Sequence, residues 1–357
     1  MSELERFYAG KSVFVTGHTG FKGAWLTHWL AMLGARVTGF ALPPETAPSL
    51  FELAKTAGVC THVEGDVRDL GALRASLEAH QPEIVLHLAA QSLVRRGYRE
   101  PVDTYATNVM GTVNLLEACR LSSSVRTIVV VTSDKCYENR EQIWPYREVD
   151  AMGGHDPYSA SKGAAELVTA SYRSAFMRER GVGLASGRAG NVVGGGDWAE
   201  DRLIPDIVRG ATRGEKVLIR NPRSTRPWQH VLEPVGGYLL LAMRLHQDPA
   251  RFAEGWNFGP NEGDDGVPVS VVAPRFVAAL GRGELDIAKE PPPGAPHEAH
   301  LLRVDSTKAR VELGFRPRLD LETTLAWTGA WYRKHLEEPG SERALLEEQI
   351  AAYAALG

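Results

Sequence analysis

Three glycines spaced three residues apart, Gly17, Gly20 and Gly23, constrain the fold of this chain more than any other feature. They follow a β-branched run at 12–16 and open an apolar helical pattern at 25–33, after which a second β-branched run begins. In this context the first glycine allows a tight turn, the second lets backbone approach a pyrophosphate, and the third lets the helix pack close to the sheet. The segment therefore predicts the first βαβ unit of a dinucleotide-binding sheet, with the phosphates at the helix N-terminus.

The second strand pattern ends without the acidic residue that usually contacts the ribose of NAD. Residues 40–44, Phe-Ala-Leu-Pro-Pro, offer neither a carboxylate for the ribose hydroxyls nor an arginine for a 2′-phosphate, so this strand leaves NAD and NADP open. Asp66 follows a third strand pattern and suits an adenine amino group, but capping the next helix is an equally good role. Asn108 either bonds main chain at a helix irregularity or is an ordinary polar helix position.

Two mostly apolar runs, at 83–90 and 126–133, are typical of buried parallel strands. Ligands of open parallel sheets bind outside the carboxyl ends of the strands. We therefore expect Ser133, Asp134 and Lys135 to lie near the glycine turn. Together these patterns predict an α/β protein with a doubly wound parallel sheet of the Rossmann type.

Tyr158 and Lys162 lie four residues apart in a helical pattern that begins just after Pro157. On a helix they project from one face, one turn from each other. A lysine ammonium at that place favours the phenolate and lowers the tyrosine pKa from its usual value of about 10. Such pairs are common on exposed helices, so the prediction of a catalytic pair depends on a nicotinamide site and a substrate site converging there.

The regular alternation of strands and helices fails after Asp197, which predicts a second domain. We expect a dinucleotide-binding domain at 1–187, to which 228–260 returns. A smaller mixed α/β substrate domain would comprise 188–227 and 261–335, followed by a helical tail at 336–357 with a packing role. Several arginines of this region lie in loops near Gly, Asn, Pro and Trp; they are either a solvated surface or part of a nucleoside-diphosphate pocket.

The composition narrows the class of protein. A net charge of −4 over 357 residues gives no polycation to hold nucleic acid. The charged N-terminus lacks a signal-peptide pattern, and no apolar run approaches the roughly 20 residues of a membrane helix. Cys60, Cys119 and Cys136 have no metal-site spacing, and an odd count suits reduced thiols in the cytoplasm. We expect a cytoplasmic enzyme with no metal.

These motifs resemble the extended short-chain dehydrogenase/reductase superfamily over nearly the whole chain and, within it, the CDP-glucose 4,6-dehydratase family. The segments that carry the resemblance are 16–24, 133–139, 156–163 and 188–198. The last three are specific, whereas the glycine turn is shared by many relatives. The missing acid after the second strand also looks like this family, which implies NAD as the cofactor.

The resemblance implies oxidation of CDP-glucose at carbon 4, loss of water across carbons 5 and 6, and return of hydride to carbon 6. Tyr158 would take the proton of the 4-hydroxyl, Ser133 would bond the 4-oxygen, and Asp134 would protonate the leaving 6-hydroxyl. Lys162 would orient the NAD ribose. The expected cofactor contacts, beyond Tyr158 and Lys162, are Gly17, His18, Thr19, Gly20, Phe21, Lys22, Gly23, Asp66, Val67, Leu88, Ala89, Ala90, Gln91, Asn108 and Thr132. The expected substrate contacts are Asn191, Asp197, Arg202, Leu203, Arg220, Arg226, His230 and His300, with Arg226 on the diphosphate.

Lys135 departs from the related dTDP-glucose dehydratases, which carry a glutamate there as the base at carbon 5. An ammonium cannot accept a proton, so Lys135 is the base only if it is neutral; otherwise it stabilises the enolate. The alternatives to a dehydratase are a nucleotide-sugar 4-epimerase and a non-catalytic NAD-binding regulatory protein. Helices near 100–120 and 157–180 would pair in a homodimer or homotetramer.

Overall fold

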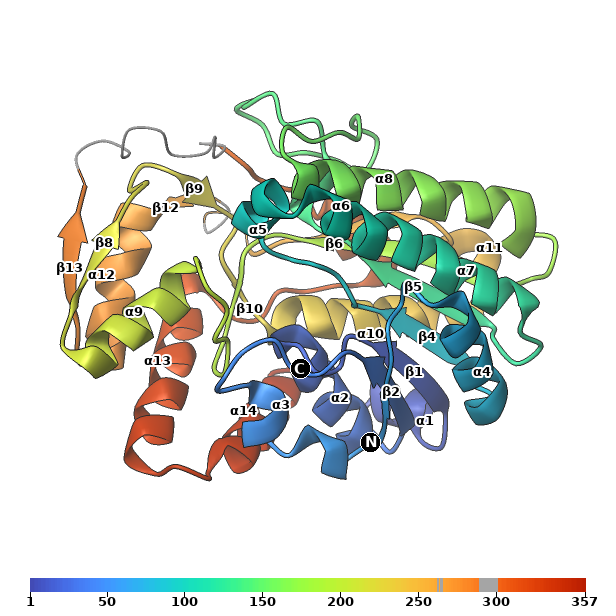
Figure 1. Ribbon diagram of the computed structural model, residues 1–357, viewed down its shortest axis with the longest axis horizontal. Coiled ribbons are helices and arrows are strands. Elements are labelled where there is room, and N and C mark those ends of the chain that lie inside the picture. The colour runs from blue at the N-terminus through green and yellow to red at the C-terminus, as the bar shows by residue number, and fades with distance from the viewer. Residues whose placement is uncertain (262, 264–265, 289–300) are drawn as a thin grey trace.

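The computed structural model describes residues 1–261, 263, 266–288 and 301–357 (Figure 1). Its centre is a seven-stranded parallel sheet in the order β11-β6-β5-β4-β1-β2-β3, which confirms the predicted doubly wound fold. The strands are β1 (Ser12–Thr16), β2 (Arg36–Ala41), β3 (Thr61–Glu64), β4 (Ile84–His87), β5 (Thr127–Val131), β6 (Gly183–Ala189) and β11 (Gly255–Phe258).

Side chains of the central strands alternate between two apolar layers, one on each face of the sheet. In β1, Val13 and Val15 belong to one buried cluster and Phe14 to the other. This burial on both faces explains why the strands are apolar without a break in the sequence. One layer is covered by α4 (Leu70–His80), α7 (Gly111–Leu121) and α8 (Pro157–Tyr172), with α5 (Val94–Arg99) and α6 (Pro101–Tyr105) beside them (Figure 1).

The opposite layer is covered by α2 (Phe21–Met32), α10 (Leu232–Gln247), α1 (Glu3–Tyr8) and α14 (Glu342–Ala355). The C-terminal helix α14 is packed against the sheet domain along one face. Tyr353 stacks edge-on against Trp29 at 5.6 Å and donates a hydrogen bond to Glu233 Oε2 at 2.6 Å. The tail therefore completes the cover over α2 and α10. Short helices α3 (Leu50–Leu53) and α11 (Pro249–Phe252) lie in connections.

A second lobe follows β6. We use this name for α9 (Leu203–Arg213), α12 (Val269–Leu280), α13 (Leu321–Glu337) and three strand pairs. The pairs are β7 (Val192–Val193) with β10 (Gln229–His230), β9 (Thr225–Arg226) with β12 (Val267–Pro268), and β8 (Lys216–Ile219) with β13 (Glu284–Ile287). Between these segments the chain returns to the main sheet, where β11 pairs with β6. The exact domain boundaries stay a prediction.

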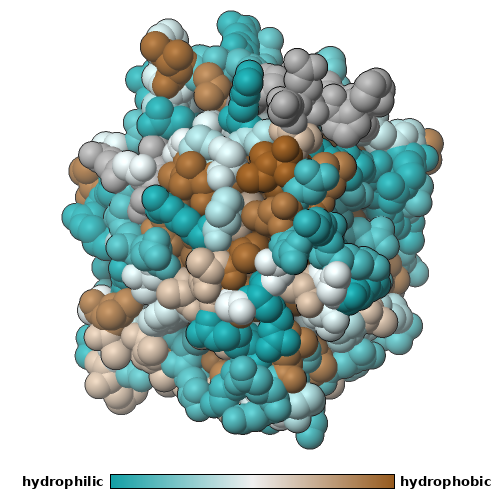
Figure 2. Space-filling model, turned by 90° about the vertical axis from the view of Figure 1, so that its left-hand side faces the viewer, coloured by the Kyte–Doolittle hydropathy of each residue, from teal (hydrophilic) through white to brown (hydrophobic). Residues whose placement is uncertain are grey.

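Figure 2 views the molecule from the side on which the β8–β13 pair lies in Figure 1, and polar residues cover most of this face around smaller apolar areas. Leu218 of β8 and Ile287 of β13 are 48% and 43% exposed. Within the described ranges, no helix has both the length and the apolar character needed to cross a membrane.

Candidate active site

A cavity of about 610 Å³ opens at the carboxyl ends of the central strands, between the sheet and the second lobe. It brings together most of the residues predicted from the sequence. On the cofactor side these are Gly17, Thr19, Gly20, Phe21, Lys22, Gly23, Asp66, Val67, Leu88, Ala89, Ala90, Gln91 and Thr132. The proposed reaction centre contributes Ser133, Asp134, Lys135, Tyr158 and Lys162, and the substrate side contributes Asn191, Asp197, Arg202, Leu203, Arg220 and Arg226.

In the glycine turn, backbone segments lie so close together that a side chain would not fit between them. Gly17 has φ +77°, and a Cβ there would lie 2.6 Å from Ala89 N at the end of β4. A Cβ on Gly23 would lie 2.1 Å from Gly17 O. No side chain caps the N-terminus of α2, whose first residue follows Gly20, so its backbone N–H groups are left to a ligand. These features fit the diphosphate of a dinucleotide.

Two predicted cofactor residues lie behind the cavity wall and support it. Asn108 is buried in a π-helical turn (Ala106–Met110) between α6 and α7. Its Oδ1 accepts from Gln91 N at 2.8 Å, and its Nδ2 donates to Gln91 O and to Ser161 Oγ. The helix irregularity thus exists, and Asn108 bonds the main chain of Gln91. His18 is fully buried, with Nε2 2.7 Å from His62 Nδ1.

The structure excludes one of the two roles considered for Asp66, and its contact with adenine stays a prediction. Helix α4 is capped by Asp69, whose Oδ1 accepts from Ala72 N, so Asp66 does not serve as its N-cap. The carboxylate of Asp66 instead accepts from the backbone and side chain of Arg68 and lines the cavity.

One predicted substrate contact does not reach the cavity. His230 is fully buried, with its ring edge-on to Trp25 and Trp327 at 5.9 Å, and its Nδ1 accepts from Leu232 N. The prediction that it binds substrate is wrong in this structure because β10 turns the ring inward, between these two tryptophans. His300 lies outside the described residues.

Helix α8 carries Tyr158 and Lys162, and its start explains their placement. Asp156 is the N-cap: its Oδ1 accepts from Ser159 N at 3.0 Å and its Oδ2 from Ser159 Oγ at 2.5 Å. Pro157 occupies the first helical position, where no N–H is needed. This start aims the next turn, and both side chains, into the cavity.

The pKa of Tyr158 moves opposite to the sequence-based expectation. Burial raises it to about 12; a hydrogen bond from Ser133 lowers it, and the charge of Asp134 raises it. Lys162 Nζ donates to Val131 O at 3.4 Å, and burial lowers its pKa to about 8 while Glu166 opposes that shift. Burial therefore outweighs the groups that lower the pKa of Tyr158, and the lowering expected from Lys162 stays a prediction.

Asp134 is buried at the end of β5 in a short 3-10 turn (Asp134–Cys136). Its Oδ1 accepts from Ser133 Oγ at 2.8 Å, whereas Oδ2 is buried without a hydrogen-bond partner among the described residues. Burial raises the pKa of this carboxyl group, against the opposing charges of Lys135 and Arg226. A carboxyl group in such a place is suited to hold a proton and donate it.

A buried ion pair behind the reaction centre was missed in the sequence. Glu166 and Arg188 meet at 2.8 Å, and Glu166 also accepts from Thr132 Oγ1 and Ser186 Oγ. Arg188 Nη1 donates to Tyr137 OH. This cluster ties the end of β5, β6 and α8 together, and its members Thr132 and Glu166 lie one residue before Ser133 and one helical turn after Lys162. The sequence held a signal, since Tyr158, Lys162 and Glu166 repeat every four residues along one helix face.

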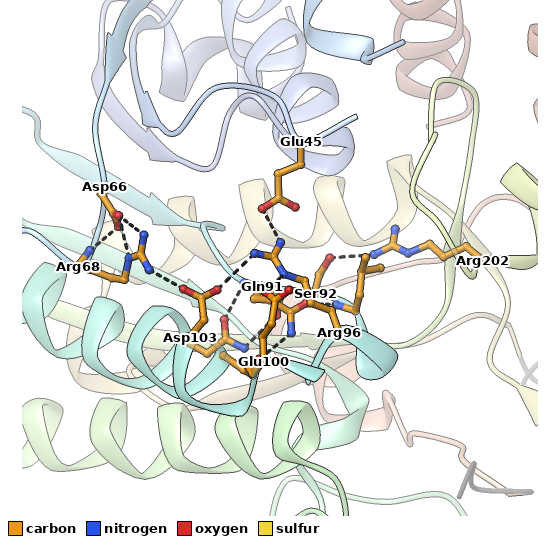
Figure 3. Close-up of polar contacts among 12 residues, drawn as sticks. Glu45, Asp66, Arg68, Gln91, Ser92, Arg96, Glu100, Asp103 and Arg202 are labelled. Atoms are coloured by element: carbon orange, nitrogen blue, oxygen red, sulfur yellow. Dashed lines mark hydrogen bonds and ion pairs between the residues drawn. The ribbon is translucent and has the colours of Figure 1, made fainter. Parts of the chain in front are cut away.

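Arginines and acids pair across the mouth of the cavity (Figure 3). Arg202 bonds Asp197 at 3.0 Å and Ser92 Oγ at 3.1 Å. Arg95 and Arg220 both contact Asp201, at 3.3 and 3.1 Å. These contacts join α5 to the second lobe. Nowhere in the described part of the chain do three or more His, Cys, Asp or Glu side chains gather as metal ligands.

A doubly wound sheet with a glycine cradle, a Tyr-Lys pair and a serine at one cavity defines an extended short-chain dehydrogenase/reductase. The chain belongs to the GDP-mannose 4,6 dehydratase family, whose model matches residues 14–328.

Individual relatives agree with this assignment. The chain is 51% identical to CDP-glucose 4,6-dehydratase of Salmonella typhimurium, over 92% of this chain and 93% of the relative. Among solved structures, UDP-glucose 4-epimerase of Thermotoga maritima superposes with a TM-score of 0.77 at 24% identity, covering 91% of this chain and 99% of the epimerase. The dTDP-glucose 4,6-dehydratase of Bacillus anthracis, in complex with NAD, gives 0.75 at 21% identity, covering 92% and 98%. At these identities the two structures share the fold.

Proposed function

We propose that the chain is a CDP-glucose 4,6-dehydratase that converts CDP-glucose to CDP-4-keto-6-deoxyglucose. The observation that carries the proposal is the buried Asp134 carboxyl group beside Ser133 and Tyr158 in one cavity; one of its oxygens has no hydrogen-bond partner among the described residues. Loss of water needs a proton donor for the leaving hydroxyl in addition to the oxidising pair. CDP as the nucleotide rests on the relative that is 51% identical.

NAD is the proposed cofactor, and the residues present fit it. The cradle formed by Gly17, Gly23 and the uncapped α2 N-terminus would hold its diphosphate, and Lys162 would hold its nicotinamide ribose. When bound, NAD supplies a hydride acceptor for carbon 4, a hydride source for carbon 6 and a positive charge near the phenol. The dehydratase of similar fold from Bacillus anthracis was solved with NAD.

Tyr158, Ser133 and Asp134 each have a different part in the proton transfers of the reaction. Tyr158 takes the proton of the 4-hydroxyl, for which its raised pKa must fall; the hydrogen bond with Ser133 and the charge of Arg202 act in that direction. The single hydroxyl proton of Ser133, which is donated to Asp134 Oδ1 in the structure, would turn to the 4-oxygen when substrate is bound. Once carbon 4 is a ketone, the proton on carbon 5 is acidic. Asp134 gives its proton to the departing 6-hydroxyl, because burial keeps that carboxyl group protonated to higher pH.

Lys135 is half-buried on the same turn as Asp134 and lines the cavity. We propose that it serves carbon 5, either as the base when neutral or by stabilising the enolate when charged. A Lys135→Met variant tests its part. Exchange of the carbon-5 proton with solvent, measured in D₂O, should be slower in this variant in either case. The pH dependence of this exchange in the unaltered protein separates the two roles: exchange rises with pH if the neutral lysine is the base and falls with pH if the charged lysine stabilises the enolate.

The rival activities use the same scaffold. A 4-epimerase needs the Tyr158–Lys162 pair and the dinucleotide but has no use for a buried acid. A non-catalytic regulatory protein needs none of the three side chains. Incubation with CDP-glucose, followed by detection of a 4-keto sugar and of CDP-galactose, separates the three. The 4-keto-6-deoxy product is expected; CDP-galactose alone, or unchanged substrate, contradicts the proposal.

We further propose that the enzyme is a homodimer or homotetramer paired through α6–α7 and α8, which lie side by side on one surface (Figure 1). Large apolar side chains are exposed there: Val102 (81%), Leu167 (63%), Met110 (51%), Phe176 (41%) and Tyr105 (40%). Light scattering of Val102→Asp/Leu167→Asp should show monomers if this surface pairs.

We also propose that the protein works in the cytoplasm, because its three cysteines are unpaired, as is usual in that compartment.

A further inference from the structure

The wall of the cavity beyond β2 contains an acidic residue that the strand end itself lacks. The uncharged residues Ala41, Leu42 and Pro43 line the cavity, and so does Glu45, which comes after them in the sequence. The carboxylate that reads the ribose 2′-hydroxyl of NAD usually stands at the end of the second strand. In this chain, Glu45 is the first carboxylate after that strand.

Glu45 is the end member of an alternating row of charges that runs along the side of the cavity on which Asp66 lies (Figure 3). Its Oε1 lies 2.9 Å from Arg96 Nη1 of α5, which comes from the opposite side of the opening. We call this row the charge chain; it consists of Glu45, Asp66, Arg68, Arg96, Glu100 and Asp103.

Both guanidinium groups of the charge chain are fully engaged by carboxylates. Arg96 contacts Glu100 at 2.8 Å and Asp103 at 3.3 Å in addition to Glu45. Arg68 contacts Asp103 at 2.5 Å and Asp66 at 2.6 Å. Four carboxylates against two guanidinium groups leave a net charge of −2. No arginine of the charge chain is therefore available to bind an added phosphate, and the local potential opposes one.

We propose that Glu45, held by Arg96, replaces the acid that β2 lacks and makes the site select the dinucleotide without a 2′-phosphate. Its carboxylate can accept further hydrogen bonds from a ribose diol while Arg96 orients it. A 2′-phosphate would bring an anion against the net negative charge chain. The inference rests on the dinucleotide-binding part of the proposed function and does not depend on the identity of the sugar nucleotide.

The test measures dissociation constants of NAD⁺ and NADP⁺ by calorimetry on the purified full-length chain, without any sugar nucleotide. The unaltered protein should bind NAD⁺ more tightly. In Glu45→Gln, NAD⁺ affinity should fall and NADP⁺ affinity should rise, because Nη1 of Arg96 loses its carboxylate partner while Glu100 and Asp103 still hold the rest of the guanidinium group. The preference should shrink by roughly tenfold, the effect of one charged hydrogen bond. In Glu45→Gln/Arg96→Met the gain for NADP⁺ should disappear.

Glu3→Gln is the matched control, because Glu3 is also exposed and pairs with an arginine, Arg244, at 2.7 Å on α10. It should leave the preference unchanged. Three results would overturn the inference. The NAD⁺/NADP⁺ preference of Glu45→Gln could stay within about twofold of that of the unaltered protein, or the gain for NADP⁺ could survive the added Arg96→Met. The unaltered protein could also show no preference. If the affinities change as predicted but the protein does not act on CDP-glucose, only the proposed activity is contradicted. If the protein binds neither NAD⁺ nor NADP⁺, both the proposed activity and the inference about Glu45 are contradicted.

Discussion

The buried pair of Glu166 and Arg188 should support both the stability of the protein and the titration of Lys162. Glu166 is 5% exposed and accepts four hydrogen bonds: Thr132 Oγ1 at 2.5 Å, Ser186 Oγ at 2.7 Å, and Arg188 Nε and Nη2 at 3.0 and 2.8 Å. Glu166→Gln keeps the shape of the side chain but leaves the Arg188 charge buried without its counter-ion. Removal of one partner from a buried pair costs about 3–5 kcal/mol.

The same substitution should change the pH dependence of turnover. The Glu166 carboxylate raises the pKa of Lys162, which burial otherwise lowers to about 8. Without that carboxylate the ammonium loses its proton at lower pH. If the charged lysine is needed, the alkaline limb of the pH–rate profile should move to lower pH. A purely structural role would reduce stability without moving that limb.

Urea unfolding and a pH–rate profile, measured on Glu166→Gln and on Glu179→Gln, test this reasoning. Glu179 is exposed just beyond α8, so its substitution removes the same charge without breaking the pair. The control should match the unaltered protein. A loss of unfolding free energy below about 1 kcal/mol in Glu166→Gln, the level of a surface pair, would refute the stability argument. An unmoved alkaline limb would remove Glu166 from the control of Lys162.

Three further substitutions probe the site directly. Tyr158→Phe should leave NAD affinity nearly unchanged and lower turnover by about 10²–10⁴, the usual contribution of a general base; near-normal turnover would exclude Tyr158 from the chemistry. Asp134→Asn should let oxidation at carbon 4 proceed while elimination stalls, so reduced-nicotinamide absorbance should build up under CDP-glucose, and a loss of turnover without it would move Asp134 to another step. Arg226→Ala should raise KM for CDP-glucose by the equivalent of about 1.5–3 kcal/mol, with partial rescue in Arg226→Lys, and an unchanged KM would remove Arg226 from the diphosphate.

The features that could be predicted from the sequence depend on contacts between near neighbours in the chain. The glycine turn requires close backbone approach within one βαβ unit, and Gly17 and Gly23 approach each other in this way. The start of α8 follows from Asp156 and Pro157, which act on the turn that they open. The sheet could be predicted because buried parallel strands are apolar on both faces.

The features that escaped prediction depend on segments far apart in the chain. Glu45 and Arg96 are 51 residues apart, and only the folded cavity brings their charges together. His230 has the composition of a binding residue, but the tryptophans around it come from α2 and α13. The pKa of Tyr158 is raised chiefly by burial. Sequence spacing carries no information about burial of this kind.

The central claim is the conversion of CDP-glucose, and the most direct test is turnover with CDP-, dTDP-, GDP- and UDP-glucose side by side under one condition. The readout is formation of the 4-keto-6-deoxy sugar, expressed as kcat/KM for each nucleotide. We predict the highest value for CDP-glucose, with the NAD pool unchanged after complete conversion. A higher value for dTDP-glucose, or no ketone from any of the four, would contradict the claim.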